Sequence, residues 1–114
     1  VVVAKGDKAN EARAAGAEVV FVDCNRDDLC ASFADFEAKA LAHRPRAAFL
    51  VHIGGHLAFE VERIAEFCRA EGIFLIEDCA HAHGASFHGR RAGVVFVLLS
   101  YLFSRNSFQV PELA

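Results

Sequence analysis

The sequence of 114 residues contains no methionine and no tryptophan, and it has only two prolines. Because methionine is missing, we expect that Val1 is not a translation start. The chain also opens on three successive valines, which is typical of a segment buried inside a larger structure. We therefore expect a fragment or a partial reading frame. With 54% apolar residues, the composition excludes an intrinsically disordered chain.

The sequence also lacks a basic block and a long apolar run. The net charge is −3, so nucleic acid is not an expected partner. The longest apolar run, residues 92–103, is interrupted by Ser100 and is shorter than the roughly 20 residues that cross a bilayer. We therefore expect no membrane partner. The first residues carry no basic region followed by an apolar core, so nothing indicates a secretory signal.

Two kinds of motif are missing as well. No Cys-x-x-Cys pair occurs among the four cysteines, so reduced thiols in a cytosolic protein are the expectation. No glycine-rich phosphate loop of the G-x-G-x-x-G or G-x-x-x-x-G-K type occurs either. The sequence therefore does not support a nucleotide-binding module of those types.

What the sequence does contain is an alternation of helical and apolar segments. Turn and cap residues separate them: Ser32 before a helix, then Pro45 and Gly72 after helices. Alternating elements predict parallel βαβ units, and hence an α/β fold of three layers with a mostly parallel sheet. The predicted helices are residues 8–15, 33–43 and 58–71, and the predicted strands are residues 18–22, 47–51 and 73–76, with one further strand at 94–99.

The strand that begins at Ile73 ends in two acids, Glu77 and Asp78, and two histidines follow closely. Ligands of open α/β sheets bind outside the carboxyl ends of the strands, so an acid at this point can take part in chemistry. Aspartate is also a common N-cap, and Asp78 could simply cap a following helix. Its position alone leaves both interpretations open.

Five of the six histidines lie between residues 52 and 88. His52 and His56 flank two glycines after a strand, where they either face a ligand beside Asp78 or bond backbone groups. We favour backbone bonding for His56 and leave His52 open as part of an active-site loop. Cys79 is interpreted as a packing residue, because a nucleophilic thiol needs a neighbouring base and a lowered pKa.

A metal site would draw on Cys79, His81 and His83, with His88 close by. The first three would share one face of an extended segment but not of a helix. Zinc sites usually pair their ligands in two clusters, and this spacing does not. We therefore expect no metal ion, and a metal-binding module is the weakest of the functional alternatives.

Four motifs resemble, in their order and spacing, the DegT/DnrJ/StrS family of pyridoxal-phosphate-dependent sugar aminotransferases. The resemblance is clearest over residues 18–93, and Glu-Asp-x-Ala-His-Ala-x-Gly is its most specific part. It implies the aspartate aminotransferase fold, called fold type I, with residues 1–93 as part of the cofactor-binding large domain. The motifs are EVVFVD at 18–23, VHIGG at 51–55, IEDCAHAHGA at 76–85 and GRRAG at 89–93.

The resemblance also implies two cofactor-binding residues. Asp78 matches the family aspartate that pairs with the protonated pyridine nitrogen of pyridoxal phosphate, a charge-assisted bond worth about 1.5–3 kcal/mol. His81 matches a position, often glutamine in the family, that lies beside the ring near its phenolic oxygen. Glu77 should point away, because successive strand residues face opposite sides of a sheet.

The sequence departs from the family pattern downstream. The lysine that forms the Schiff base should follow Asp78, yet the chain has lysine only at positions 5, 8 and 39. The expected Gly-Asp-Ala-Gly stretch is missing, and the motifs stop near Gly93. We therefore predict no catalytic residue in this chain. We also predict that residues 94–114 are a divergent apolar tail, produced by a frameshift or a truncated gene model.

The function implied by the resemblance is amino transfer to a nucleotide-linked keto-sugar from an amino-acid donor, in a cytoplasmic homodimer. As it stands, the chain should be an incomplete and inactive piece of such an enzyme, because the lysine and the phosphate site are missing. The alternative is a non-catalytic α/β module with a binding or structural role.

Overall fold

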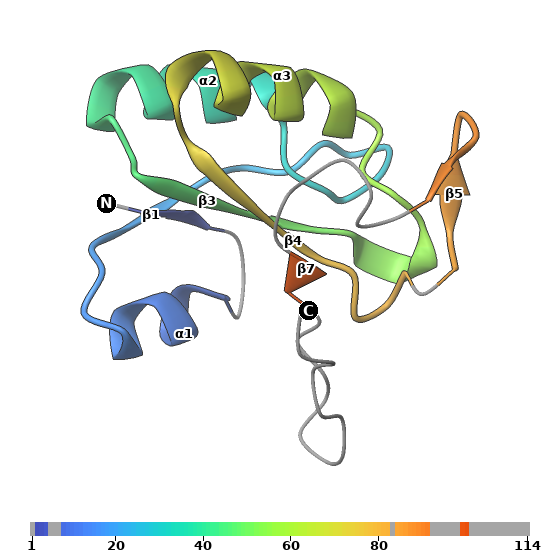
Figure 1. Ribbon diagram of the computed structural model, residues 1–114, viewed down its shortest axis with the longest axis horizontal. Coiled ribbons are helices and arrows are strands. Elements are labelled where there is room, and N and C mark those ends of the chain that lie inside the picture. The colour runs from blue at the N-terminus through green and yellow to red at the C-terminus, as the bar shows by residue number, and fades with distance from the viewer. Residues whose placement is uncertain (1, 5–7, 83, 92–98, 101–114) are drawn as a thin grey trace, which may run out of the picture.

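A parallel β-sheet forms the centre of the molecule (Figure 1). The computed structural model describes residues 2–4, 8–82, 84–91 and 99–100. Within these residues the sheet has five strands in the order β2-β1-β3-β4-β7, and every neighbouring pair is parallel. The strands are β1 (Val2–Ala4), β2 (Val19–Phe21), β3 (Ala47–Val51), β4 (Phe74–Asp78) and β7 (Leu99–Ser100).

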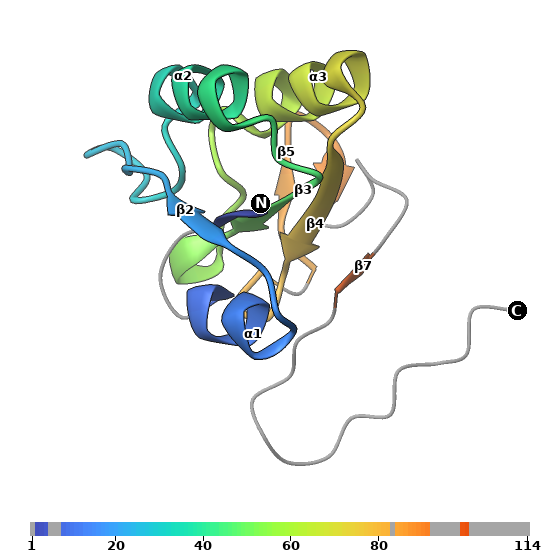
Figure 2. The same cartoon turned by 90° about the vertical axis from the view of Figure 1, so that its left-hand side faces the viewer.

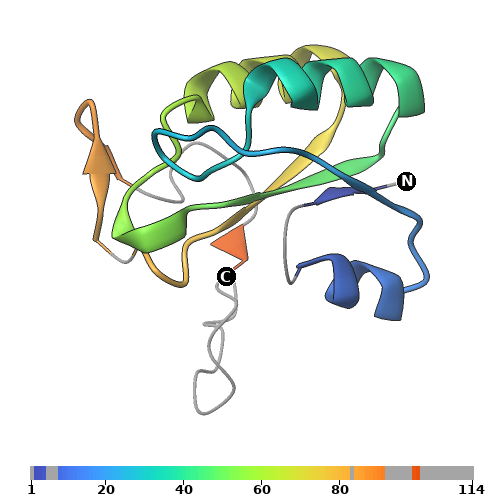
Figure 3. The ribbon, with the colours of Figure 1, turned by 180° about the vertical axis from the view of Figure 1, so that it is seen from behind.

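Helices cover both faces of this sheet, so the predicted three-layer arrangement is confirmed. Helix α1 (Lys8–Ala14) lies on one face, and helices α2 (Phe33–His43) and α3 (Val61–Glu71) lie side by side on the other (Figures 1, 2 and 3). The connection β1-α1-β2 runs toward one edge of the sheet, whereas β2-α2-β3 and β3-α3-β4 run toward the other. Right-handed crossovers in opposite directions place their helices on opposite faces.

Helix α2 has the predicted bounds but a different cap. Ser32 occupies the N-cap position with extended backbone angles, yet its side chain makes no capping hydrogen bond. The backbone N–H of Phe33 instead donates to Oε1 of Glu60, at 3.2 Å. At the other end Arg44 adopts a left-handed conformation, with φ of 50°, and its N–H donates to the carbonyl of Ala40.

Helix α3 begins three residues later than predicted. The predicted apolar stripe is confirmed, since Val61, Ile64, Ala65 and Cys68 are all buried. Residues 58–60 form a turn instead, in which the Val61 N–H donates to the Ala58 carbonyl at 3.2 Å, while the N–H groups of Ala58 and Phe59 are bonded to side chains outside the helix. The helix ends at Gly72, whose φ of 69° and N–H bond to the Cys68 carbonyl fit the predicted glycine stop.

Strand β4 continues through both acids instead of ending before them. It pairs with β3 in a register that ends with Val51 opposite Asp78. Leu75 and Glu77 are buried on the side of helices α2 and α3, which we call the α2/α3 face. By strand alternation, Phe74 and Asp78 lie on the opposite side, which we call the α1 face.

The segment after β4 contains a hairpin that was not predicted from the sequence. Strands β5 (Ser86–Phe87) and β6 (Arg90–Arg91) pair antiparallel. The two residues between them, His88 and Gly89, both have positive φ, at 50° and 78°. Two such residues are the mark of a type I′ turn, whose twist suits a tight hairpin.

Most of the predicted strand at 94–99 lies outside the described residues, as does the predicted divergent tail apart from Leu99 and Ser100. Those two residues form β7, which pairs with Glu77 and Asp78 of β4. None of the described helices has the length and apolar character needed to cross a membrane.

Candidate active site

Asp78 is the last residue of β4, at the carboxyl edge of the sheet. Its side chain is 5% exposed, and its Oδ1 accepts a hydrogen bond from the backbone N–H of Ala80 at 3.0 Å. The next residues form a tight turn closed by the N–H of Ala82 and the carbonyl of Cys79, at 2.9 Å. Over residues 79–82 the chain forms no helix, so Asp78 orders a turn and does not cap a helix there.

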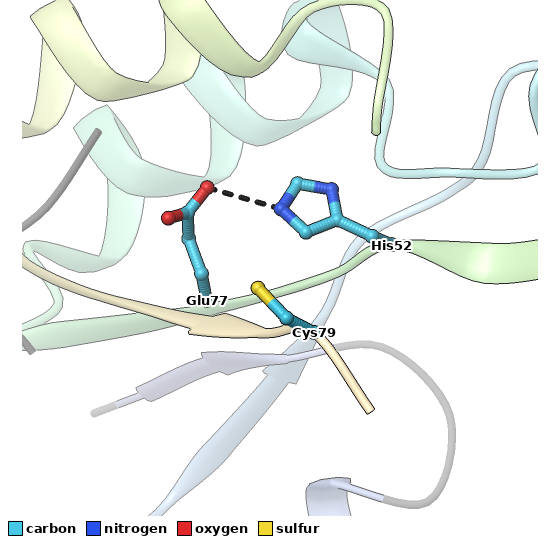
Figure 4. A group of neighbouring side chains, drawn as sticks. All are labelled: His52, Glu77 and Cys79. Atoms are coloured by element: carbon cyan, nitrogen blue, oxygen red, sulfur yellow. Dashed lines mark hydrogen bonds and ion pairs between the residues drawn. The ribbon is translucent and has the colours of Figure 1, made fainter. Parts of the chain in front are cut away.

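Glu77 and Asp78 point to opposite faces of the sheet, as predicted. On the α2/α3 face, Glu77 Oε1 lies 3.0 Å from Nε2 of His52, and both side chains are almost wholly buried (Figure 4). The other ring nitrogen, Nδ1, accepts the backbone N–H of Ala58 at 3.0 Å. Because Nδ1 is an acceptor, the ring proton is on Nε2 and is donated to Glu77.

The structure thus places His52 on the face opposite Asp78. Its side chain is 0% exposed, and both ring nitrogens are bonded within the protein. These contacts favour a packing role over a ligand-facing one. The backbone of His52 nevertheless touches the Asp78 residue, since its N–H donates to the Asp78 carbonyl at 3.1 Å.

Cys79 completes a buried group with His52 and Glu77 on the α2/α3 face (Figure 4). One nitrogen, oxygen or sulfur atom from each lies within 4.8 Å of the others. Burial, together with the negative charges of Glu77 and Asp78, raises the pKa of the Cys79 thiol from 9.0 to about 12. A thiol that stays protonated at neutral pH is a poor nucleophile, which supports the packing interpretation of Cys79.

His56 bonds a backbone group, which confirms the interpretation favoured from the sequence. Its Nε2 lies 3.2 Å from the carbonyl oxygen of Asp28. The side chain of Asp28, which is 1% exposed, accepts the N–H of Cys30 at 3.0 Å and the N–H of Phe59 at 2.7 Å. Asp28 was not predicted from the sequence, because nothing in its polar loop distinguishes it from Asp27.

The loop after β3 and the turn after β4 meet at the carboxyl edge of the sheet. A Cβ added to Gly55, whose φ is 86°, would lie 3.3 Å from the carbonyl oxygen of His81. The His81 side chain is exposed, whereas Cys79 is buried, so these two residues of the metal set considered from the sequence lie in different surroundings. His83 lies outside the described residues.

The model of the DegT/DnrJ/EryC1/StrS aminotransferase family matches residues 8–104. The chain belongs to this family. The match continues past Gly93, the last residue of the four motifs, and therefore includes residues that were predicted to form a divergent tail.

Two curated relatives in this aminotransferase family show the range of substrates in their names. The chain is 38% identical over 95 residues to dTDP-4-dehydro-2,3,6-trideoxy-D-glucose 4-aminotransferase of Saccharopolyspora spinosa, covering 83% of this chain and 24% of the relative. It is 42% identical over 74 residues to L-glutamine:scyllo-inosose aminotransferase of Streptomyces griseus, covering 65% of this chain and 17% of the relative. The chain thus spans about a quarter or less of each relative.

Among solved structures, 3-amino-5-hydroxybenzoic acid synthase matches with a TM-score of 0.71 and 28% identity, over 82% of this chain and 25% of the other. Its likeness confirms the α/β fold of the fold type I aminotransferases that the motifs predicted.

Proposed function

We propose that this chain supplies part of the cofactor-binding large domain of a pyridoxal-phosphate-dependent aminotransferase, with Asp78 as the partner of the pyridine nitrogen. The observation that carries the proposal is the placement of Asp78. It ends β4 at the carboxyl edge of the sheet, on the α1 face, with its carboxylate oriented by the N–H of Ala80. Ligands of open α/β sheets bind at that edge.

The chemistry of the donor fits the group. When bound, the cofactor supplies an electron sink through its protonated ring nitrogen. A carboxylate facing that nitrogen favours the protonated ring, because the opposite charge stabilises it. The bond from Ala80 holds Oδ1, so the carboxylate has a fixed direction before any ligand arrives.

His81 is proposed to lie beside the ring, near its phenolic oxygen. Its side chain is exposed, and its backbone packs against Gly55 at the same edge of the sheet. An exposed imidazole there is accessible to a ligand, whereas the buried imidazole of His52 is not. An active-site role for His52 stays a prediction that its contacts do not favour.

The proposal assigns no Schiff-base lysine to this chain. All three lysines precede Asp78; Lys8 and Lys39 belong to helices α1 and α2, and Lys5 lies outside the described residues. We therefore expect that the chain by itself does not catalyse amino transfer. For the whole enzyme we propose amino transfer from an amino acid to a nucleotide-linked keto-sugar, in a cytoplasmic homodimer. The relative named L-glutamine:scyllo-inosose aminotransferase adds scyllo-inosose as a second kind of substrate to test.

An NMR titration with pyridoxamine 5′-phosphate tests the Asp78 assignment, because this form has no aldehyde to react with surface lysines. We expect shifts at the amides of residues 78–82. The Asp78→Asn variant should bind at least about tenfold more weakly, since it loses a charge-assisted bond. Asp27 is exposed, so Asp27→Asn is the matched control, and this variant should bind pyridoxamine 5′-phosphate as the unchanged chain does.

Two outcomes contradict the proposal. Equal affinity in Asp78→Asn would remove the ring-nitrogen role from Asp78. No binding by the unchanged chain would instead favour the alternative, a non-catalytic α/β module, for which the missing downstream lysine is the supporting observation.

A further inference from the structure

The side chain of Glu77 is buried next to Asp78 in the chain, and one of its two oxygens has no hydrogen-bond partner among the described residues. It is 1% exposed, and its Oε1 contacts His52 at 3.0 Å. Its Oε2 accepts no hydrogen bond from any residue that the structure describes. Burying a carboxylate that is only half satisfied costs free energy that an apolar side chain would avoid. The acid at this point therefore needs an explanation beyond packing.

A metal ion is the first explanation to test, because Cys79 and His52 lie against Glu77. The hydrogen bonding of His52 argues against it. Its Nδ1 accepts the N–H of Ala58, so its proton is on Nε2, which faces Glu77. A cation bound through Nε2 would have to displace that proton while Nδ1 remained an acceptor, leaving a deprotonated ring. The group is better described as hydrogen-bonded.

The bonds of His52 converge on two successive residues of β4. Its ring donates to the Glu77 carboxylate, and its backbone N–H donates to the Asp78 carbonyl at 3.1 Å. Its other ring nitrogen holds Ala58, in the turn that leads into α3. One histidine thus ties together the end of β3, the end of β4 and the start of α3.

We propose that Glu77 is a positioning residue for Asp78, acting through His52. Glu77 fixes the His52 ring, His52 fixes the backbone at Asp78, and that backbone sets the direction in which the Asp78 carboxylate points on the other face. The consequence for cofactor binding rests on the proposed function above. The consequence for the conformation of Asp78 does not, and it can be measured without any ligand.

Amide hydrogen exchange of the whole chain measures that consequence. The His52 amide reports the bond to the Asp78 carbonyl, and the Ala80 amide reports the bond to the Asp78 carboxylate. The Phe36 amide of α2, which donates to the carbonyl of the N-cap residue Ser32, serves as the reference for overall stability. Glu77→Leu removes the acceptor at similar volume, and Glu77→Gln keeps an acceptor oxygen.

In Glu77→Leu, exchange at His52 and Ala80 should rise about tenfold relative to Phe36, the change that a lost hydrogen bond of ordinary strength produces. In Glu77→Gln, exchange relative to Phe36 should stay close to that of the unchanged chain. Glu66→Leu, on the exposed side of α3, is the matched control and should change none of the ratios. Equal acceleration of all three amides in Glu77→Leu would show a purely structural acid and overturn the proposal.

Glu77→Asp keeps the test decisive if Glu77→Leu does not fold. The shorter side chain cannot keep the 3.0 Å contact, so His52 and Ala80 should again exchange faster than Phe36. Unchanged exchange at both amides would overturn the proposal. Titration with pyridoxamine 5′-phosphate then separates the two proposals. If Asp78→Asn binds normally, the proposed function fails while the exchange result stands. If the exchange ratios are unchanged but Asp78→Asn binds weakly, only the positioning role fails.

Discussion

The two faces of the sheet differ in how completely they are covered. On the α2/α3 face, Leu50 and Leu75 are each 1% exposed. On the α1 face, Phe21 and Phe74 remain 48% and 47% exposed, and α1 packs against β1 and β2. The covered face forms the core of the described molecule. On the other face, the Phe74 ring of β4 stays half-exposed.

The same difference separates two neighbouring acids. Glu77 lies on the covered face, where a buried carboxylate needs a hydrogen-bond donor, and the His52 ring supplies it. Asp78 enters the other face at the carboxyl edge, where its carboxylate is oriented by a turn. A single strand thus presents one acid that is hydrogen-bonded inside the covered face and one that we propose for cofactor binding, because its side chains alternate.

The largest effect on stability should come from truncating one of two successive residues of β4 that face opposite sides of the sheet. Leu75→Ala removes a side chain enclosed by the α2/α3 core and should lower the free energy of unfolding by about 2–5 kcal/mol. Phe74→Ala, one residue earlier, removes a half-exposed ring and should cost well under half as much. Denaturant unfolding measures both. Equal losses would mean that the α1 face is packed as fully as the other.

The loop that joins β2 to α2 should show the next largest effect. Asp28→Ala leaves the N–H groups of Cys30 and Phe59 without their acceptor, and should lower the free energy of unfolding by about 3 kcal/mol. Asp27→Ala, at an exposed position, should change it by less than about 0.5 kcal/mol. Chemical denaturation again provides the measurement. A small loss in Asp28→Ala would show that the loop is not held by this carboxylate.

Alkaline pH should destabilise the covered face through its buried thiols. Burial raises the pKa of Cys68 from 9.0 to about 12, and Cys79 rises equally far. Above pH 9 the unfolded thiols ionise while the folded ones stay protonated. Their contribution is therefore complete below pH 9 and is lost as the pH rises toward 12, by about 1.4 kcal/mol per thiol at pH 10.

Unfolding curves of single variants at pH 8 and pH 10 separate this contribution from other alkaline titrations. Cys68→Ala should lose less stability between the two pH values than the unchanged chain. Cys24→Ala, whose side chain is exposed, should lose as much as the unchanged chain. An identical loss in all three proteins would mean that the Cys68 thiol does not titrate differently on unfolding.

The smallest effect should come from the outer surface of α2. Lys39 Nζ lies 2.8 Å from Asp35 Oδ2, and this bond, followed by the one from the Asp23 N–H, lowers the pKa of Asp35. Lys39→Gln should cost about 0.3–0.5 kcal/mol near neutral pH. The loss should vanish in high salt, and also as the pH falls through the lowered pKa of Asp35, because the protonated acid no longer pairs. A loss that survives in 1 M salt would contradict this ion-pair origin.

Local patterns in the sequence determined the elements and their order. The bounds of α2 and β3 followed from apolar spacing, from Ser32 and from Pro45, all of which act within a few residues. The placement of Glu77 and Asp78 on opposite faces of the sheet followed from the alternation of side chains along a strand. The hairpin at 86–91 was missed, because a His-Gly pair is a weaker turn signal than Asn-Gly or Asp-Gly.

Only the tertiary structure decided which polar groups meet. No pattern in the sequence marks Glu60. Its side chain nevertheless accepts the first backbone N–H of α2, from Phe33, which lies 27 residues away in the chain. The turn before α3 shows the same dependence, since side chains of His52 and Asp28 accept the N–H groups of Ala58 and Phe59. Helix and strand periods are set by neighbours along the chain. Partners of buried polar atoms are set by the packing of elements against one another, which no local pattern records.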